Sequence, residues 1–326
     1  MGAQVSAMKV FAFDYASGGG GDGSTGATPP DSLKHHGRIM LGALLADLAA
    51  LPEIELITIS EPGLFAHRFD ACLQAADAVW PLAPEAGGLL ERLSRQVLRR
   101  NRILLGSRPA ALRVAASKLR TARALARAGV AVVATYTPGQ ALPDWRGGWV
   151  VKPDDGAGCL NTRIFPDANA ALAWIAASGD AGYVLQPFIQ GKLGRLSLLC
   201  CEDDAQVLSC NEQRIAVRDN QFHFLGTTVN SICDDAGRFA RLARSVNAAI
   251  PGLWGYVGVD FIVTGQGVVV LEVNPRLTTS YCGLHASIGC NPAALVLDLL
   301  ERPAGTPRAR TKPVAVSVDV AAFGSA

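Results

Sequence analysis

The chain has 326 residues, which is enough for two or three subdomains. Apolar residues make up 49% of it and charged residues 18%, a composition typical of a folded globular protein and not of a disordered one. The net charge of +2 is too small to indicate nucleic acid or an anionic membrane as a partner. No apolar run reaches the length of a membrane span and no signal-peptide pattern opens the chain, so we expect a cytoplasmic protein.

The first third of the chain alternates between strand-like and helix-like patterns. We expect strands at 9–15, 54–59, 78–80 and 103–105, and helices at 33–51, 85–100 and 109–128. Strands that alternate with helices predict a small parallel α/β domain over about residues 9–110.

A glycine-rich loop follows the first predicted strand. The dinucleotide-binding motif G-x-G-x-x-G is formally matched by Gly18, Gly20 and Gly23. That motif requires a helix to begin within it, but here the chain continues to Pro29 and Pro30, so a dinucleotide site is not favoured. A mobile loop is the simpler interpretation. A lid near a second substrate is the alternative, and it makes Gly18 and Gly19 candidate substrate contacts.

The rest of the chain is richer in β patterns. We expect strands at 130–134, 149–152, 183–189, 195–201, 207–216 and 222–229, and helices at 168–177, 236–249 and 292–300. The tail at 302–326 ends in an alternating apolar segment that could form an edge strand.

Residues 255–276 predict a β-hairpin with one polar face. Two apolar runs flank Gly265-Gln266-Gly267, a glycine loop typical of hairpins. If Thr264 pairs with Val268, Asp260 lies opposite Glu272, and Asn274 projects from the same face. Tyr256, Gly258, Ile262 and Val270 would share that face. The opposite face would be core, with Val257, Val259, Phe261, Val263, Val269, Leu271 and Val273.

Two carboxylates placed so close together repel each other unless a cation lies between them. Carboxylate and amide oxygens suit Mg²⁺, which usually binds through one or two carboxylates plus substrate phosphates. Asp260, Glu272 and Asn274 are therefore candidate ligands for Mg²⁺, and Mn²⁺ could use the same oxygens. A solvent-facing hairpin that happens to contain these residues is the alternative.

Two further segments have features of a nucleotide site. Lys152 ends a predicted strand and precedes a turn with Asp155, Gly156 and Gly158, whose backbone amides could wrap an anion. An ordinary hairpin is the alternative. The strand ending at Gln186, Pro187, Phe188 and Ile189 could present main-chain groups to an adenine edge, although a plain strand would explain it too.

The order of these features resembles the ATP-grasp superfamily over about residues 110–300. The resemblance rests on Lys118, the Lys152 glycine loop, Q-P-F-I and the D-(x11)-E-x-N-P-R hairpin. It implies three subdomains: an α/β domain at 1–110, a central α+β subdomain at 111–190 and a C-terminal antiparallel-sheet subdomain at 191–326.

The same resemblance implies roles for single residues. Lys118 and Lys152 would contact ATP phosphates, and the loop from Asp155 to Cys159 would close over them. Gln186 to Ile189 would hold adenine, Asp260, Glu272 and Asn274 would bind Mg²⁺, and Arg276 would face the transferred phosphate or the acyl intermediate. Many ATP-grasp proteins have an acidic ribose ligand just after the adenine segment, and residues 191–197 offer none.

The segments F-D-Y-A-S-G-G-G (13–20) and N-P-R-L-T-T-S-Y (274–281) resemble a narrower group. They are similar to the tyramine–glutamate ligases of methanofuran biosynthesis and their relatives in methylofuran formation. This implies a ligase that joins glutamate to tyramine or tyrosine through an acyl phosphate. Thr278, Thr279 and Ser280 would line the acceptor site.

The expected partners are thus a small-molecule carboxylate and an amine, with a homodimer as the assembly to test. Two alternatives stay open. An ATP-grasp kinase would phosphorylate a metabolite without condensing it, and a nucleotide-binding protein would show no turnover.

Overall fold

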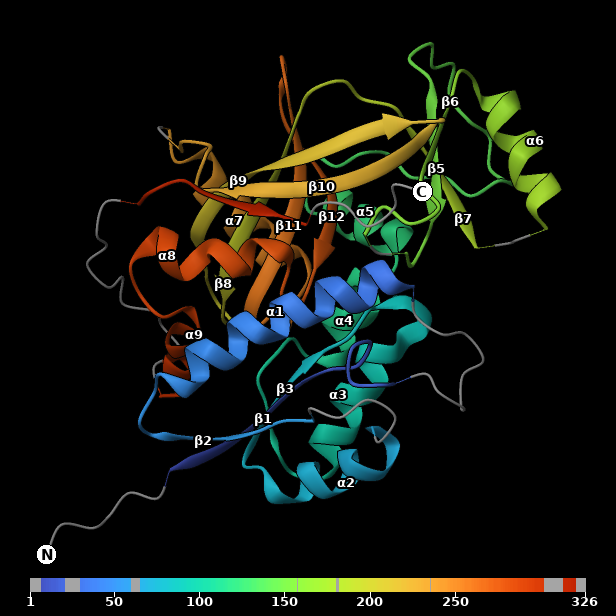
Figure 1. Ribbon diagram of the computed structural model, residues 1–326. Coiled ribbons are helices and arrows are strands. Elements are labelled where there is room, and N and C mark those ends of the chain that lie inside the picture. Colours follow the sequence, from blue (N-terminus) through green and yellow to red (C-terminus); the bar gives the residue numbers. More distant parts are fainter. Residues whose placement is uncertain are drawn as a thin grey trace, which may run out of the picture.

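The computed structural model describes residues 7–20, 30–59, 65–156, 158–179, 182–234, 236–301 and 313–320 (Figure 1). The N-terminal elements, blue to teal, form one layer, and the long yellow and orange strands form another. A green unit containing α6 (Ala168–Ser178) lies at one end of the second layer. Gly23 of the glycine-rich loop lies outside the described residues.

The first four strands form a parallel sheet in the order β2-β1-β3-β4, as the alternating pattern predicts. These strands are β1 (Met8–Asp14), β2 (Ile54–Ile57), β3 (Ala78–Leu82) and β4 (Ile103–Leu104). Helices α1 (Asp31–Ala49), α2 (Phe65–Ala75) and α3 (Leu89–Arg99) lie between them in sequence, because parallel neighbours need crossover connections. Val10 and Phe11 are fully buried in different core clusters, so both faces of β1 are covered.

Two helix predictions in this region need correction. Helix α2 was missed, although Phe65, Phe69 and Leu73 recur at helical spacing and are buried. The helix predicted at 85–100 begins instead with the 3₁₀ helix η1 (Ala86–Gly88), because Gly87 and Gly88 adopt positive φ.

The helix predicted at 109–128 is in fact two helices, α4 (Pro109–Ala115) and α5 (Lys118–Arg127). Ser117 separates them with an extended backbone, and its side chain accepts a hydrogen bond from Arg120 N–H at 3.1 Å. A serine in this role is a strong N-cap. Lys118 is therefore the first residue of a helix.

The remaining described strands form one nine-stranded sheet with the order β12-β11-β8-β9-β10-β6-β5-β7, and β13 pairs with β10. They are β5 (Trp149–Pro153), β6 (Arg163–Phe165), β7 (Tyr183–Pro187), β8 (Lys192–Cys200), β9 (Ala205–Arg218), β10 (Gln221–Val229), β11 (Gly255–Thr264), β12 (Gly267–Asn274) and β13 (Val316–Asp319). A single residue pair, Gln221 with Arg163, joins β10 to β6. The segment predicted as a strand at 130–134 forms only an isolated bridge between Val132 and Val270.

The predicted hairpin forms, with one change of register. Asp260 pairs with Glu272 as expected, but Thr264 pairs with Gly267 and not with Val268. A bulge between Asp260 and Phe261 makes up the difference of one residue.

The bulge also exchanges the environments of neighbouring residues on β12. Val270 is buried in the core with Val268 packed beside it, whereas Leu271 faces a cavity beside Glu272. Val269 pairs with Ile262, which lines the same cavity. The predicted faces were therefore wrong at Val269, Val270 and Leu271.

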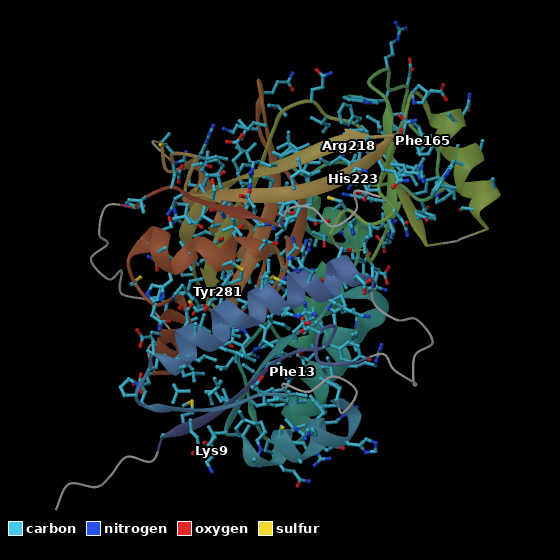
Figure 2. All side chains as sticks on the ribbon, viewed as in Figure 1. Lys9, Phe13, Phe165, Arg218, His223 and Tyr281 are labelled. Carbon is cyan, nitrogen blue, oxygen red and sulfur yellow. The ribbon has the colours of Figure 1, made fainter. Side chains whose placement is uncertain are left out.

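Helix α1 lies between the two layers (Figure 1). Its Leu44 and Leu48 share a core cluster with Tyr281 and Leu284, and Figure 2 shows side chains filling the space around Tyr281. Tyr281 lies in the 3₁₀ helix η2 (Thr279–Gly283), which leads into α8 (Leu284–Ile288) and α9 (Pro292–Glu301). A second cluster packs the large sheet against α4, α5 and α7 (Arg238–Ala249). The domain boundaries at 110 and 190 stay predictions.

Within the described ranges, no single helix has both the length and the apolar character to cross a membrane. One bent pair, Thr279–Ile288 with Pro292–Glu301, satisfies length and composition only when its two parts are taken together.

Candidate active site

Two adjoining cavities lie at the centre of the protein. The larger cavity, ≈ 360 Å³, is lined by both predicted phosphate lysines and by Gly156, Gly158 and Gln186–Ile189. The smaller cavity, ≈ 100 Å³, is lined by Asn274, Arg276, Thr278 and Thr279 together with Asp14 and His36. Gly158, Cys159, Gln213, Asp260 and Glu272 line both. The two predicted metal carboxylates therefore stand on the boundary between the cavities.

Asp260 is paired with an arginine that the sequence reasoning missed. Arg195 on β8 lies directly opposite Asp260 on β11, and its Nη2 donates to Asp260 Oδ2 at 2.8 Å while Nε donates to Oδ1. Burial raises the pKa of the Asp260 carboxyl, and the charge and hydrogen bonds of Arg195 act against this. Burial opposes the charge on Arg195 as well, but Asp260 outweighs it and raises the pKa of the guanidinium. This is a buried, bidentate ion pair.

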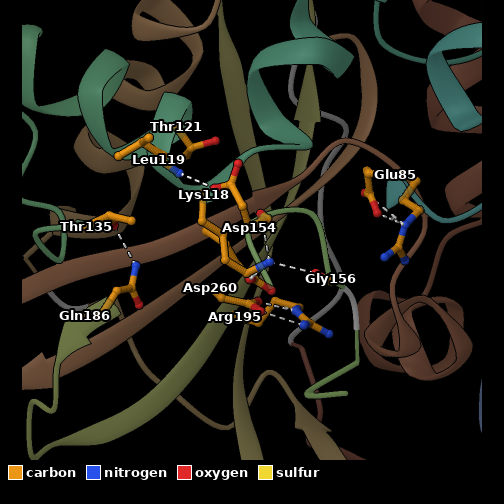
Figure 3. Close-up of polar contacts among 12 residues, drawn as sticks. Glu85, Lys118, Leu119, Thr121, Thr135, Asp154, Gly156, Gln186, Arg195 and Asp260 are labelled. Carbon is orange, nitrogen blue, oxygen red and sulfur yellow. Dashed lines mark hydrogen bonds and ion pairs between the residues drawn. The ribbon is translucent and has the colours of Figure 1, made fainter. Parts of the chain in front are cut away.

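Glu272 faces a lysine on α5. Lys118 Nζ lies 3.7 Å from Glu272 Oε2 and donates to the carbonyl of Gly156 at 2.7 Å (Figure 3). The start of α5 also docks on the glycine loop, because Leu119 N–H donates to Asp154 Oδ1 at 2.9 Å. Burial works against ionisation of Glu272, but Lys118 and Lys152 hold its pKa down to about 2.

Lys152 is buried at the end of β5 and faces the larger cavity, with 8% of its surface exposed. No described group accepts a hydrogen bond from its ammonium. Burial lowers the pKa of Lys152 to about 8; Glu272 opposes the shift and Lys118 adds to it. An ammonium in this environment gains from any anion that enters the cavity.

The predicted adenine segment lines the larger cavity, and one of its amides is already engaged. Phe188 N–H donates to the carbonyl of Gly148 at 2.9 Å, so it is not free for a ligand. Gln186 is 2% exposed, and its Nε2 donates to Thr135 Oγ1 at 2.8 Å. Contacts from Pro187 and Ile189 to adenine stay predictions.

Not every predicted loop residue reaches a cavity. Asp155 is exposed and accepts a hydrogen bond from Gly87 N–H at 2.8 Å, so its side chain contacts the N-terminal region. Gly156 and Gly158 do line the larger cavity, and Ala157 lies outside the described residues. Gly18 and Gly19 form the turn after β1 and line neither cavity.

The strand end after Asn274 forms a wall of the smaller cavity. Arg276 Nε donates to Glu85 Oε2 at 2.9 Å, which links this wall to the turn after β3. Thr278 Oγ1 lies 2.8 Å from the hydroxyl of buried Tyr256. Ser280 is fully buried and lines neither cavity, so it is a less suitable substrate contact than its two neighbours.

The donor set at the cavity boundary fits a hard divalent cation. Within the described ranges, no group of three or more His, Cys, Asp or Glu residues could hold a metal alone. Glu272 and Asn274 contribute oxygens beside the boundary, and each oxygen of Asp260 can still accept beyond its contact with Arg195. Two carboxylates and an amide suit Mg²⁺ that keeps waters and shares phosphate oxygens.

The fold and this site define an ATP-grasp architecture, and comparison with known proteins agrees. A family described as "ATP-grasp domain" matches residues 115–280, about half of the chain, and a "pre ATP-grasp 3 domain" matches 39–112. The chain therefore belongs to the ATP-grasp family. This confirms the fold and the resemblance expected from the sequence.

Individual relatives give a more specific comparison. The chain is 32% identical over 131 residues to a tyramine–L-glutamate ligase from Methanocaldococcus jannaschii. The aligned segment spans 38% of this chain and 41% of that relative, less than half of its length.

Solved structures match over most of the chain. A protein from Archaeoglobus fulgidus assigned to the ATP-grasp superfamily is 25% identical, with a TM-score of 0.71 over 90% of this chain and 88% of that one. D-alanine–D-alanine ligase from Bacillus anthracis, solved with ATP, is 16% identical, with a TM-score of 0.62 over 90% and 95%. The second likeness shows the fold alone.

Replacing Lys152 by methionine should stabilise the nucleotide-free protein at neutral pH. The pKa of about 8 in the folded state lies below the ordinary value of 10.5, so wild-type stability rises as the pH increases through this window. At pH 7 the lysine is charged in both states, and Lys152→Met should be more stable by about 3 kcal/mol, a gain that shrinks above pH 8. Urea unfolding of both proteins at pH 7 and pH 9 measures this difference in the free energy of unfolding.

Lys192→Met is the matched control, because Lys192 is half exposed and paired with Glu212 on the surface. It should change stability by less than about 1 kcal/mol at both pH values. A Lys152→Met protein that is less stable than wild type at pH 7 would contradict the assignment of a buried, unpaired ammonium.

Proposed function

We propose that this protein is an ATP-dependent carboxylate–amine ligase that forms ADP and acts through an acyl phosphate. The acid is glutamate, and the amine is tyramine, tyrosine or a related amine, in cofactor synthesis of the methanofuran type. The ATP-grasp family and the partial likeness to a tyramine–L-glutamate ligase support this proposal. The observation that favours it most is that two cavities share the carboxylates Asp260 and Glu272.

In this proposal the larger cavity binds ATP. Phosphoryl transfer requires positioning and neutralisation of charge. Lys118 and Lys152 approach the phosphates from two sides, and the loop at Gly156 and Gly158 covers them and excludes water that would hydrolyse an acyl phosphate. Mg²⁺, held by Glu272, Asn274 and Asp260, would supply charge neutralisation on the phosphate oxygens when bound.

The smaller cavity binds the acid and the amine. A carboxylate oxygen of the acid attacks the γ-phosphorus and ADP leaves. The neutral amine then attacks the acyl carbon, inorganic phosphate leaves, and the nitrogen releases one proton. Arg276, oriented by Glu85, lies where it can contact the anionic acyl phosphate. No side-chain nucleophile is required.

The central test is nucleotide turnover with both partners. The protein should release ADP from ATP and Mg²⁺ only when L-glutamate and tyramine or tyrosine are both present, and mass spectrometry should detect the condensed amide. Release of AMP would exclude an acyl phosphate. A phosphorylated substrate without condensed product would indicate a kinase, and nucleotide binding without release would indicate a binding protein.

Glu272→Gln should lower ATP turnover by about 10²–10³-fold, because it removes a charged oxygen ligand at the cavity boundary. The thermal midpoint should fall, because the change leaves buried Lys118 without its counter-ion, although Lys118 keeps its hydrogen bond to Gly156. Asp260→Asn should lose turnover to a similar degree and should lower the midpoint in the same way, because it leaves Arg195 buried without its counter-ion. Wild-type turnover in Glu272→Gln would overturn the metal assignment.

Thr279→Ala should raise the KM for the acid or the amine by about tenfold, which corresponds to the loss of about one hydrogen bond. The KM for ATP should not change. Ser280→Ala is the matched control, because Ser280 is a neighbouring hydroxyl that lines neither cavity. Steady-state ADP release with each substrate varied in turn separates the effects. Equal KM values in the two variants would remove Thr279 from the acceptor site.

A further inference from the structure

Asp14 occupies the ligand-binding position of the N-terminal parallel sheet. It is the last residue of β1, and it pairs with Leu82 at the end of β3. The strand order β2-β1-β3-β4 reverses direction between β1 and β3. In open parallel sheets, ligands bind outside the carboxyl ends of the strands at such a reversal. Asp14 lies at this point and lines the smaller cavity.

The Asp14 carboxylate is buried without a counter-ion. It is 4% exposed, and no described lysine, arginine or histidine forms an ion pair with it. Its hydrogen bonds come from the turn that follows, where Ser17 N–H donates to Oδ2 at 2.7 Å. Burial raises the pKa of Asp14, although Ser17 and the charge on Arg276 act in the other direction. A buried carboxylate in this state is costly unless a cation joins it.

Asp14 differs in this respect from the other charged groups around the cavity. Arg195 is paired with Asp260, Arg276 with Glu85 and Glu272 with Lys118. His36 lines the cavity too, but burial lowers its pKa, with His35 and Arg276 adding to the shift, so it is a poor source of positive charge. Among the acidic side chains that line this cavity, Asp14 is therefore the one without an ion-pair partner in the described part of the chain.

The backbone of α1 closes one side of the carboxylate. A Cβ placed on Gly37 would lie 2.2 Å from Asp14 Oδ2, so only glycine permits this approach. With the helix on that side and the turn at Ser17 on another, the cavity is the direction from which a ligand can reach the carboxylate.

We infer that Asp14 binds the α-ammonium group of an amino-acid substrate in the smaller cavity. The inference rests on the proposed ligase function and adds the residue that recognises the amino group of the acid. The amine that attacks the acyl phosphate must be neutral, so the ammonium that a carboxylate retains belongs to the substrate that supplies the carboxyl group. An acid without an amino group would leave Asp14 unpaired and would bind more weakly.

Calorimetric titration in the presence of ADP and Mg²⁺ tests whether Asp14 binds the ammonium group, by comparing the affinities of matched probes. The probes are L-glutamate, L-aspartate and L-alanine, each compared with the acid that lacks the amine: glutarate, succinate and propionate. Wild type should bind one of the amino acids at least about tenfold more tightly than its partner acid. Asp14→Asn should remove this difference by weakening the amino acid alone. Asp31→Asn, an exposed carboxylate at the start of α1, should behave as wild type.

Several outcomes would overturn the inference. One is an Asp14→Asn protein that binds an amino acid and its partner acid more weakly by the same factor. Another is a wild-type protein that binds each amino acid and its partner acid equally well. The third is an Asp14→Asn protein that binds tyramine more weakly but the amino acid as tightly as wild type does. If Asp14→Asn does not fold, comparison of L-glutamate with N-acetyl-L-glutamate on wild type replaces it, because acetylation removes the same charge; equal affinity would count against Asp14.

The same experiments separate this inference from the ligase function. If the protein prefers amino acids to their partner acids through Asp14 but forms no amide, the inference is supported and the ligase function is rejected. If the protein forms the amide but Asp14→Asn leaves the affinity for the amino acid unchanged, the ligase function is supported and the inference is rejected.

Discussion

Charges that leave water must be matched, and in this protein the matching is concentrated where β8, β11 and β12 lie side by side. Asp260 is held by Arg195 from the neighbouring strand, and Glu272 by Lys118 from α5. The hairpin register, the docking of α5 and the closing of the glycine loop all meet at these two pairs, since Lys118 also binds the carbonyl of Gly156. Loss of one partner would leave a buried charge, which is far more costly than the pair itself is stabilising. These pairs therefore hold β8 to β11, and α5 to β12 and the glycine loop.

The features that the sequence predicted well are local ones. Asp260 and Glu272 could be placed opposite each other because a short glycine loop connects their strands. The predicted register is nevertheless wrong at Thr264, and a bulge restores the expected pairing at the carboxylates. A bulge depends on packing against the core, which period-two patterns do not describe, so Val269, Val270 and Leu271 were assigned to the wrong faces.

The features that the sequence did not reveal are contacts over long separations. Arg195 faces Asp260 only because β8 pairs with β11, and 65 positions separate the two residues. Asp14 ends β1 of the parallel sheet and Glu85 lies in the turn after β3, so their place beside Arg276 depends on how that sheet packs on the large one. A strand pattern predicted β8, and an alternation of elements predicted the first domain. Neither indicates which strands become neighbours.

One short turn after β3 contacts the walls of both cavities. Glu85 binds Arg276 beside the smaller cavity, and two residues later Gly87 N–H binds Asp155 in the loop that borders the larger one. A fragment that begins after the N-terminal sheet would keep the lysines and the carboxylates but lose both anchors. The matching domain at 115–280 thus contains the lysines and carboxylates of the candidate site, whereas the contacts that orient Arg276 and the loop at Asp155 come from residues outside it. The N-terminal layer is therefore part of the frame of the candidate active site.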